Sequence, residues 1–329
     1  MGKGRAVAVR GRAVRVAAAL AVAGLVLSAC GGSPPKARPT PARRAAPQLR
    51  SPFTGEPVKS LGPVLAVKID NIPVARPPTG LTDADIVYLL PVEGGLSRIL
   101  AVFSSRLPPV IGPVRSARED DLELLRQFGR PAFAYSGAQP ELLPVVHRAR
   151  IADLYSGIVS GYFRDPNRLA PHNLYAHTQQ LLAEAHGASS AHNIGFRFGP
   201  PPAGGTVAAS ASAAYPAASF TFRWSAARAR WLVWMDGSPA GTTEDGQLGA
   251  PTVVIQYTTV RTSRFLEEGV PPPYAETTGS GTALVLRDGK EWHAHWARPN
   301  ANVGTAFTTA AGRPMTFARG QVWIMLAAR

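Results

Sequence analysis

The sequence predicts an α/β or α+β N-terminal domain followed by a smaller, mostly antiparallel β C-terminal domain. In residues 51–199, apolar runs alternate with stretches of helical periodicity, which is typical of a sheet covered by helices. The Pro/Gly-rich run "GPPPAGG" at 199–205 interrupts this pattern, as a hinge between domains does. Residues 206–329 contain short strand-like runs separated by turn residues, which predicts β-hairpins.

Residues 1–30 have the pattern of a bacterial lipoprotein signal peptide. A basic stretch precedes the apolar run "VAAALAVAGLVL", which is shorter than the roughly 20 residues that a transmembrane helix needs. The run ends in the lipobox "LSAC", and Cys30 is the only cysteine of the chain. We therefore expect palmitate and a second acyl chain on Cys30, which would anchor the secreted protein to the extracytoplasmic face of the cell membrane.

Residues 31–50 predict a disordered tether, because they are rich in proline and arginine and nearly free of large apolar side chains. The first fifty residues contain ten bases and no acid, so most of the net charge of +14 lies outside the folded part. The high net charge is therefore no argument for nucleic-acid binding, and we expect no nucleic-acid partner.

The N-terminal domain begins with three predicted strands. The run "VLAVKI" at 64–69 reads as a buried strand. The runs at 85–92 and 97–103 are joined by Gly94-Gly95, which predicts a hairpin.

A helix is predicted next, in "RSAREDDLELLRQFG", with Ser116 as its N-cap and Glu119 completing a capping box. The run "PAFAYSG" predicts another strand, and residues 139–149 and 178–187 predict two more helices.

The C-terminal domain, residues 206–329, is predicted from five short runs: "ASFTFRW", "RWLVWMDG", "TVVIQY", "TALVLRDGKEWHAHW" and "QVWIML". Asp236-Gly237 and Asp288-Gly289 have the composition of tight hairpin turns. His293 and His295 share one face of a strand, but without a third ligand nearby they favour a polar solvent face over a metal site.

Charged and polar residues gather where the predicted elements begin or end, which is where open sheets bind ligands. The candidates for ligand binding or catalysis are Asp70, Asn71, Asp85, Glu93, Arg98, Arg115, Arg118, Arg164, His172 and Asn173. Two arginines beside a capped helix start can hold an anion. The alternative is structural, since the same arginines can pair with neighbouring acids such as Glu93 or Asp165.

Several long motifs resemble the YerB-like bacterial lipoproteins, a family with paired N- and C-terminal domains of unknown function. They are "LAVKIDNIPVARPPTGLTDADIVYLLPVEGGLSRILAVF", "IGPVRSAR", "FRDPNRLAPHNLY" and the C-terminal "VVIQY", "GSGTALVLRDGK" and "QVWI". The resemblance covers about residues 51–329. It implies an envelope location and the two-domain layout, and it supplies no activity.

A weaker similarity, in the order of Asp-ended strands, hairpin arginine and Arg-rich turn, is to the LytR-CpsA-Psr phosphotransferases. In that family Asp and Arg residues grip the pyrophosphate of a lipid-linked glycan. The similarity implies that arginines would neutralise a pyrophosphate and that Asp70 or Asp85 would hold a divalent cation or act as base.

Three functions are consistent with these observations. The first is binding of an anionic or glycan component of the cell envelope in a cleft of the N-terminal domain, without a cofactor or a resident metal. The second is a phosphotransferase or hydrolase acting on pyrophosphoryl-lipid-linked glycans, for which alone a divalent cation is expected. The third is an adaptor that recruits another envelope protein through tryptophans of the β-domain.

Overall fold

The computed structural model describes residues 48–329 except 245 and 268. Cys30 and most of the predicted tether lie outside the described residues. Residues Pro47–Arg329 form one compact unit.

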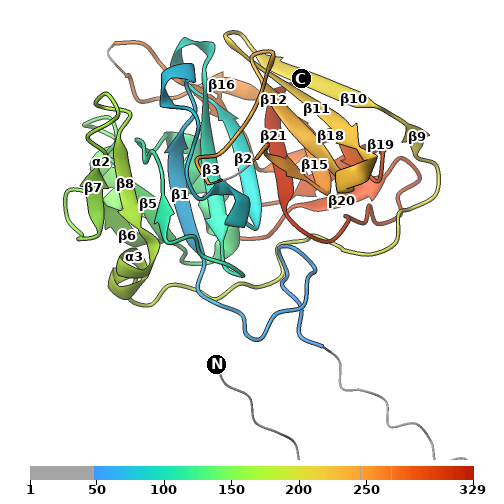
Figure 1. The fold of residues 1–329 in the computed structure, drawn as a ribbon, viewed down its shortest axis with the longest axis horizontal. Coiled ribbons are helices and arrows are strands. Elements are labelled where there is room, and N and C mark those ends of the chain that lie inside the picture. Colours follow the sequence, from blue (N-terminus) through green and yellow to red (C-terminus); the bar gives the residue numbers. More distant parts are fainter. Residues whose placement is uncertain (1–47, 245, 268) are drawn as a thin grey trace, which may run out of the picture. The chain divides into compact units, whose positions relative to one another are not determined.

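A large mixed sheet organises this unit (Figure 1). Its strands run in the order β20-β19-β18-β15-β21-β2-β3-β1-β5-β6, and β9 pairs with β19 at one end. Their bounds are β1 Leu65–Asp70, β2 Ile86–Pro91, β3 Ser97–Phe103, β5 Ala132–Tyr135, β6 Ala152–Tyr155, β9 Thr206–Val207, β15 Thr252–Thr258, β18 Gly279–Arg287, β19 Lys290–Arg298, β20 Ala306–Thr309 and β21 Val322–Ala328.

Smaller sheets and short helices cover the large sheet. The smaller sheets comprise β4 Val110–Ile111, β7 Tyr162–Arg164 and β8 Leu174–His177; β10 Ser210–Tyr215, β11 Ala218–Ser225, β12 Arg230–Met235, β13 Ser238–Pro239 and β14 Gly249–Ala250; and β16 Val260–Thr262 with β17 Pro273–Ala275. The α-helices are α1 Glu119–Leu125, α2 Leu143–His147 and α3 Thr178–Glu184.

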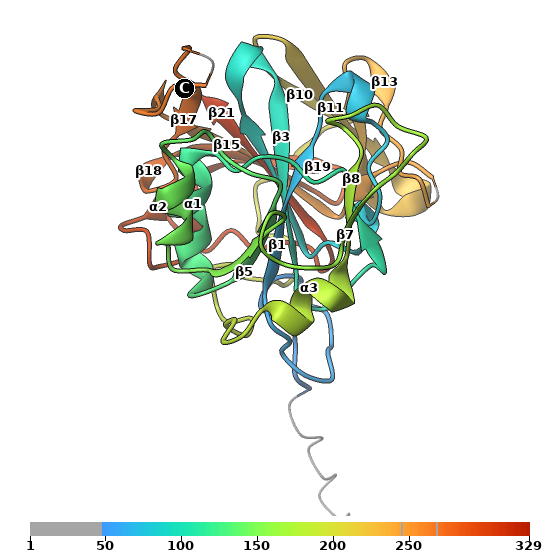
Figure 2. The same ribbon diagram turned by 90° about the vertical axis from the view of Figure 1, so that its left-hand side faces the viewer.

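Both faces are buried at the centre of the large sheet, whereas β19 alternates buried and exposed residues. Figure 2 shows α1 and α2 on one side and β10 and β11 on the other. On the helix side, Leu124 and Leu125 of α1 join Ala66 and Leu100 in one apolar cluster. On the other side, Phe220 and Trp231 belong to a second apolar cluster with alternate residues of β1, β2 and β3. This burial on both faces explains why these strands read as continuous apolar runs.

The predicted hairpin of the N-terminal segment is confirmed, since β2 and β3 pair antiparallel from Ile86↔Val102 to Pro91↔Ser97. β1 also pairs antiparallel with β3, so β1 and β2 point the same way. The predicted turns of the C-terminal segment are found too: Asp236-Gly237 and Asp288-Gly289 have positive φ at both residues, as the tight turn requires.

The last strand differs from the antiparallel expectation. β21 lies between β15 and β2 and pairs parallel with both, so strands of the two sequence segments share one sheet. The N-terminal segment has a mixed sheet, and antiparallel pairs dominate the C-terminal segment. The domain boundaries at 199 and 206 stay a prediction.

The predicted start of the helix at Ser116 is wrong. The chain stays extended through Arg118, because the Ala117 amide donates to the Gly137 carbonyl over 2.8 Å. Helix α1 begins at Glu119, and the Asp121 carboxylate accepts the Arg118 amide at 2.7 Å. Asp121, inside the first turn, therefore closes the start of the helix by accepting the amide of the residue before it.

Candidate functional site

A chain of ion pairs runs along one face of β1. Lys68 and Asp70 are two residues apart on this strand, so both side chains point to the helix-covered face. The β1–β3 register places Arg98 opposite Asp70, and the turn before α1 supplies Arg115 and Arg118. We call this set, with Glu93, Asp120, Asp121, His172 and Glu267, the charged network.

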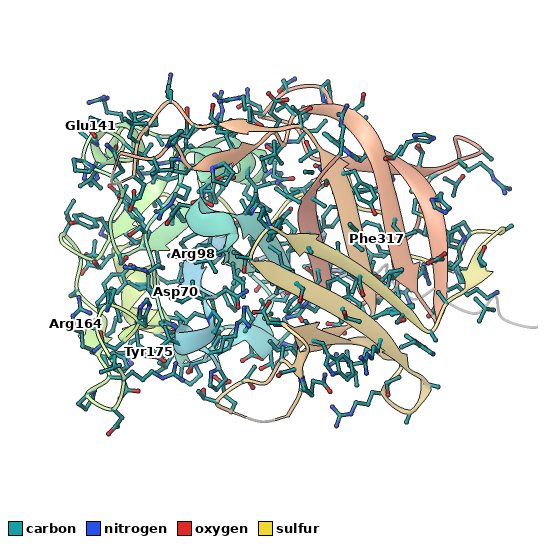
Figure 3. All side chains as sticks on the ribbon, turned by 90° about the horizontal axis from the view of Figure 1, so that it is seen from above. Asp70, Arg98, Glu141, Arg164, Tyr175 and Phe317 are labelled. Atoms are coloured by element: carbon teal, nitrogen blue, oxygen red, sulfur yellow. The ribbon has the colours of Figure 1, made fainter. Side chains whose placement is uncertain are left out.

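The open end of the charged network is centred on Asp70. Its buried carboxylate lies 3.5 Å from Arg98 Nη1, 3.2 Å from Arg115 Nε and 2.7 Å from His172 Nδ1. The Arg115 and His172 side chains remain 25% and 16% exposed. When neutral His172 donates from Nδ1, its Nε2 is left as an acceptor. Figure 3 shows Asp70 and Arg98 beside one another.

The middle of the network is a two-point pair between Arg118 and Glu93. Arg118 Nε donates to Glu93 Oε2 at 2.9 Å, and Nη2 donates to Oε1. Arg118 Nη2 also lies 3.6 Å from a Glu267 carboxylate oxygen. Burial acts to raise the pKa of Glu93, but the hydrogen bond and charge of Arg118 outweigh it and lower this pKa to about 2.

The closed end of the network is fully buried beneath α1. Lys68 Nζ lies 2.6 Å from Asp121 Oδ1, and neither side chain is exposed. Asp120 is adjacent and almost fully buried, and it accepts the Ala275 amide at 3.3 Å. Burial and then the charge of Asp121 raise the pKa of Asp120 to about 7.

Buried polar atoms without a hydrogen-bond partner concentrate in and beside this network. They include Asn71 Oδ1, Arg98 Nε, Arg115 Nε, Asp120 Oδ1 and Glu267 Oε2, which are five of the nine such atoms among the described residues. Asn71 itself donates to Ser97 Oγ at 2.9 Å, next to Arg98. Because folded proteins leave few buried polar groups unpaired, this concentration marks the network as the candidate functional site.

Seven of the predicted site residues therefore meet here: Asp70, Asn71, Glu93, Arg98, Arg115, Arg118 and His172. Asp85 does not join them. Asp85 precedes β2, whereas Asp70 ends β1. Because the two strands point the same way, the two carboxylates lie at opposite ends of these strands. Asp85 accepts the Ser104 and Ser105 amides at 2.6 and 2.9 Å, and burial raises its pKa to about 6.

Arg164 and Asn173 also lie apart from the network and act on the loop that carries His172. Arg164 Nη1 donates to Asn173 Oδ1 at 2.7 Å, and Asn173 Nδ2 donates to the Asp165 and Arg168 carbonyls. Figure 3 shows Arg164 well away from Asp70. These two side chains hold the loop closed, which positions His172.

Sequence reasoning missed Lys68, Asp120, Asp121 and Glu267. A lysine inside the apolar run "VLAVKI" is a usable signal, because a buried lysine needs an acidic partner. Asp120 and Asp121 have the pattern of acids in the first turn of a helix, which gives no sign that they are buried. Glu267 carries no such signal, since it comes from the other sequence segment.

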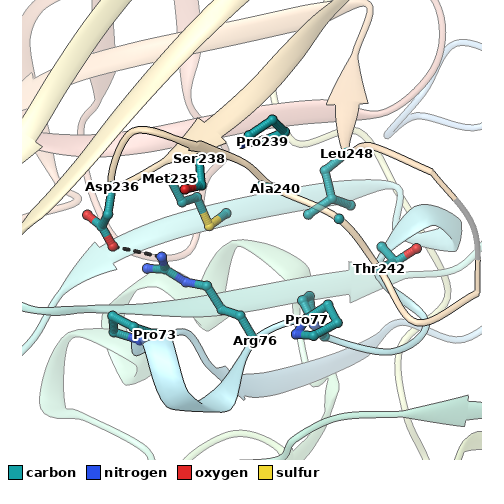
Figure 4. A pocket seen from close by; sticks show the side chains of 12 residues that line it. Pro73, Arg76, Pro77, Met235, Asp236, Ser238, Pro239, Ala240, Thr242 and Leu248 are labelled. Atoms are coloured by element: carbon teal, nitrogen blue, oxygen red, sulfur yellow. Dashed lines mark hydrogen bonds and ion pairs between the residues drawn. The ribbon is translucent and has the colours of Figure 1, made fainter.

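A hollow of about 540 Å³ is lined by residues of both sequence segments (Figure 4). Its walls are largely apolar and include Pro73, Pro77, Met235, Pro239 and Leu248. Arg76 at its edge donates to the Asn71 carbonyl through Nε and Nη2, and Nη1 lies 2.7 Å from Asp236.

Among the described residues, no group of three histidine, cysteine or acidic side chains is arranged to hold a metal ion. Within the same part of the chain, no helix is both long and apolar enough to cross a membrane.

The fold and the network define a mixed α/β protein in which two sequence segments build one central sheet around a buried ionic network. The chain belongs to the family described as protein of unknown function (DUF3048), whose N-terminal domain matches residues 53–191 and whose C-terminal domain matches residues 211–324. The resemblance to the YerB-like family is thereby confirmed.

The chain is similar to YerB of Bacillus subtilis in both sequence and structure. It is 37% identical over 137 residues to "Putative lipoprotein YerB" of Bacillus subtilis (strain 168), an alignment that spans 40% of each chain. The fold matches the crystal structure of the YerB protein from Bacillus subtilis with a TM-score of 0.72 and 21% identity, covering 85% of this chain and 96% of that one.

Proposed function

We propose that the protein is a lipid-anchored envelope lipoprotein that binds an anionic group of a cell-envelope ligand at the open end of the charged network. The lipobox at Cys30 and the lipoprotein name of the Bacillus relative support the anchor. The geometry around Asp70 supports the binding site.

The observation that carries the proposal is the crowding of cationic donors around the Asp70 carboxylate. One carboxylate is shared by two arginines and a histidine, and among the described residues the only other acid near Arg98 is Glu93, 3.9 Å away and already paired with Arg118. Arg98 Nε has no hydrogen-bond partner, and Arg115 is partly exposed. A phosphate or carboxylate group would satisfy these donors, because guanidinium groups bind such anions at two points.

Calorimetric titration of the full chain in detergent, with pyrophosphate as the probe, tests this site. Arg115→Ala should weaken binding about 10- to 150-fold, since a lost hydrogen bond to a charged group costs roughly 1.5–3 kcal/mol. Arg148→Ala is the matched control, because it removes an exposed arginine that has no contact with the network, and its affinity should equal that of the parent. Equal affinities for parent and Arg115→Ala would refute the proposal.

Two further titrations distinguish the possible ligands that carry the anion. One uses a soluble phosphate-bearing polymer, and the other uses a lipid-linked pyrophosphoryl glycan. A preference for the second, lost in Arg115→Ala, would identify a lipid-linked ligand.

A single observation favours an enzyme as the second candidate. His172 Nδ1 lies 2.7 Å from Asp70, which would hold the imidazole so that Nε2 accepts a proton from an attacking group, beside arginines that would neutralise a pyrophosphate. Release of phosphate or sugar phosphate from a lipid-linked pyrophosphoryl glycan by the parent, and its loss in His172→Gln, would support catalysis. Binding without turnover would support the first candidate alone.

The adaptor hypothesis has limited support from the tryptophans. Trp231, Trp292, Trp296 and Trp323 are buried and stabilise the core. Trp224 and Trp234 are partly exposed, so a partner that uses tryptophans would have to contact these two.

A further inference from the structure

One surface surrounds the point where the described chain begins. The segment Leu49–Gly62 folds back on itself, with the Val58 amide donating to the Leu49 carbonyl at 3.0 Å. Ser104 Oγ donates to the Gly62 carbonyl at 2.9 Å, which brings in the loop of residues 104–106. The Gly320 amide donates to the Thr54 carbonyl, which brings in Arg319. We call this the entry surface.

Basic residues dominate the entry surface. The 228–230 turn joins this surface because Trp231, directly after it, pairs with Ala250, and the next residue, Pro251, lies against Gly320. Burial and then the like charges of Arg106 and Arg228 lower the pKa of Arg230, and Glu56 acts in the opposite direction. The bases are Arg50, Lys59, Arg106, Arg228, Arg230 and Arg319, and the acids are Glu56, Asp83 and the buried Asp85. The surface therefore carries three surplus positive charges.

Most of these bases are free to bind something else. Arg106 Nε lies 3.6 Å from Asp83, but its side chain is 61% exposed. Lys59, Arg228 and Arg319 are exposed and have no ion-pair partner among the described residues. Two apolar side chains accompany them, since Leu49 is 45% and Leu61 is 37% exposed. Exposed leucines beside cationic side chains are the pattern of proteins that rest on a lipid surface.

We propose that the entry surface lies against the anionic phospholipid headgroups of the membrane. The charge is complementary, and the preceding residues 31–47 add Lys36, Arg38, Arg43 and Arg44 without any acid. The lipid anchor of the proposed function would hold this surface close to the bilayer, where even weak attraction suffices because the effective concentration is high. The surface itself can be tested without the anchor.

Such contact would orient the candidate site. β1 begins at Leu65, opposite Phe103, close to the entry surface, and it ends at Asp70, opposite Arg98. The entry surface and the open end of the charged network thus lie at opposite ends of β1. A protein resting on its entry surface presents Asp70, Arg115 and His172 away from the membrane.

The test is co-sedimentation of residues 47–329, which form one compact unit, with lipid vesicles. This fragment omits both the anchor and the basic residues before it. Binding should be measurable to vesicles of phosphatidylglycerol and phosphatidylcholine in equal parts, weak to phosphatidylcholine alone, and reduced by salt. Lys59→Gln, Arg106→Gln and Arg228→Gln together should lower the affinity for the anionic vesicles about 100-fold, since each basic residue near such a surface contributes about a factor of five.

The matched control carries Arg126→Gln, Arg148→Gln and Arg150→Gln, three exposed arginines around another hollow. It should bind the anionic vesicles like the parent, and both triple variants should keep the parent's melting temperature. Equal losses in the two variants, or no loss in the first, would overturn the proposal. Pyrophosphate titration is independent of this result, so a failure here leaves the anion site standing, and the reverse also holds.

Discussion

The two ends of the charged network start from neighbouring positions on β1 and differ in every other respect. At the closed end, Lys68 and Asp121 are fully buried, close together and covered by α1. At the open end, Asp70 is contacted by three side chains, two of which reach solvent. The comparison teaches that one ionic cluster can have two roles. The buried Lys68–Asp121 pair contributes to the stability of the fold, whereas the partly exposed arginine at Asp70 has hydrogen-bond donors that a ligand can use.

The largest effect is expected at the closed end. Lys68→Met should lower the free energy of unfolding by about 3–5 kcal/mol, because it leaves Asp121 buried without its counterion. Urea denaturation measures this, with Lys290→Met as an exposed control that changes little. An unchanged unfolding midpoint would mean that the pair does not stabilise the fold.

A smaller loss is expected from the middle of the network. Arg118→Ala removes both hydrogen bonds to Glu93 and should cost about 1.5–3 kcal/mol of stability. Arg115→Ala, at the open end, should cost less than about 1 kcal/mol, because its pair with Asp70 is partly exposed. Thermal melting of both variants separates the roles of the two arginines, and equal losses would erase the distinction between the ends.

The smallest expected effect is a dependence of the free energy of unfolding on pH, caused by Asp120. The folded-state pKa of Asp120, about 7, lies above its ordinary value of 3.8, so the folded protein keeps a proton that the unfolded chain has released. Stability therefore falls as the pH rises through this window, by at most about 1.4 kcal/mol per pH unit. Asp120→Asn should remove the part of this slope between pH 6 and 7, above the pKa of Asp85. Urea midpoints across that range measure it, and an unaltered slope would assign the effect to another group.

The local elements were predictable because they follow from short-range patterns. The apolar runs predicted β1, β2 and β3, and Gly94-Gly95 predicted the turn between the last two. The Asp-Gly pairs predicted their turns because few other residues tolerate positive φ at both positions. The proximity of seven candidate residues was predictable because they stand at element ends, a rule that needs no knowledge of the partner strands.

The predictions that were wrong or missing concern features that depend on pairing between residues far apart in the sequence. The direction of a strand decides whether two element ends meet, so Asp85 could not be separated from Asp70 without the order of β1, β2 and β3. The position of β21 was equally hidden, although its fully apolar run indicated burial on both faces. The Ser116 cap was wrong because Ala117 is held extended by Gly137, a contact outside the helix itself.

The place of β21 also determines when the central sheet can close. β2 and β15 are not neighbours in the sheet order, and β21, which follows both of them in the chain, lies between them. During synthesis β2 therefore keeps one side unpaired until β21 has been made. Such late closure favours slow folding and exposes the unpaired strand to mispairing in the interval. A truncation before Val322 would leave β2 and β15 each with an unpaired side, so the loss of one strand would open the sheet at two places.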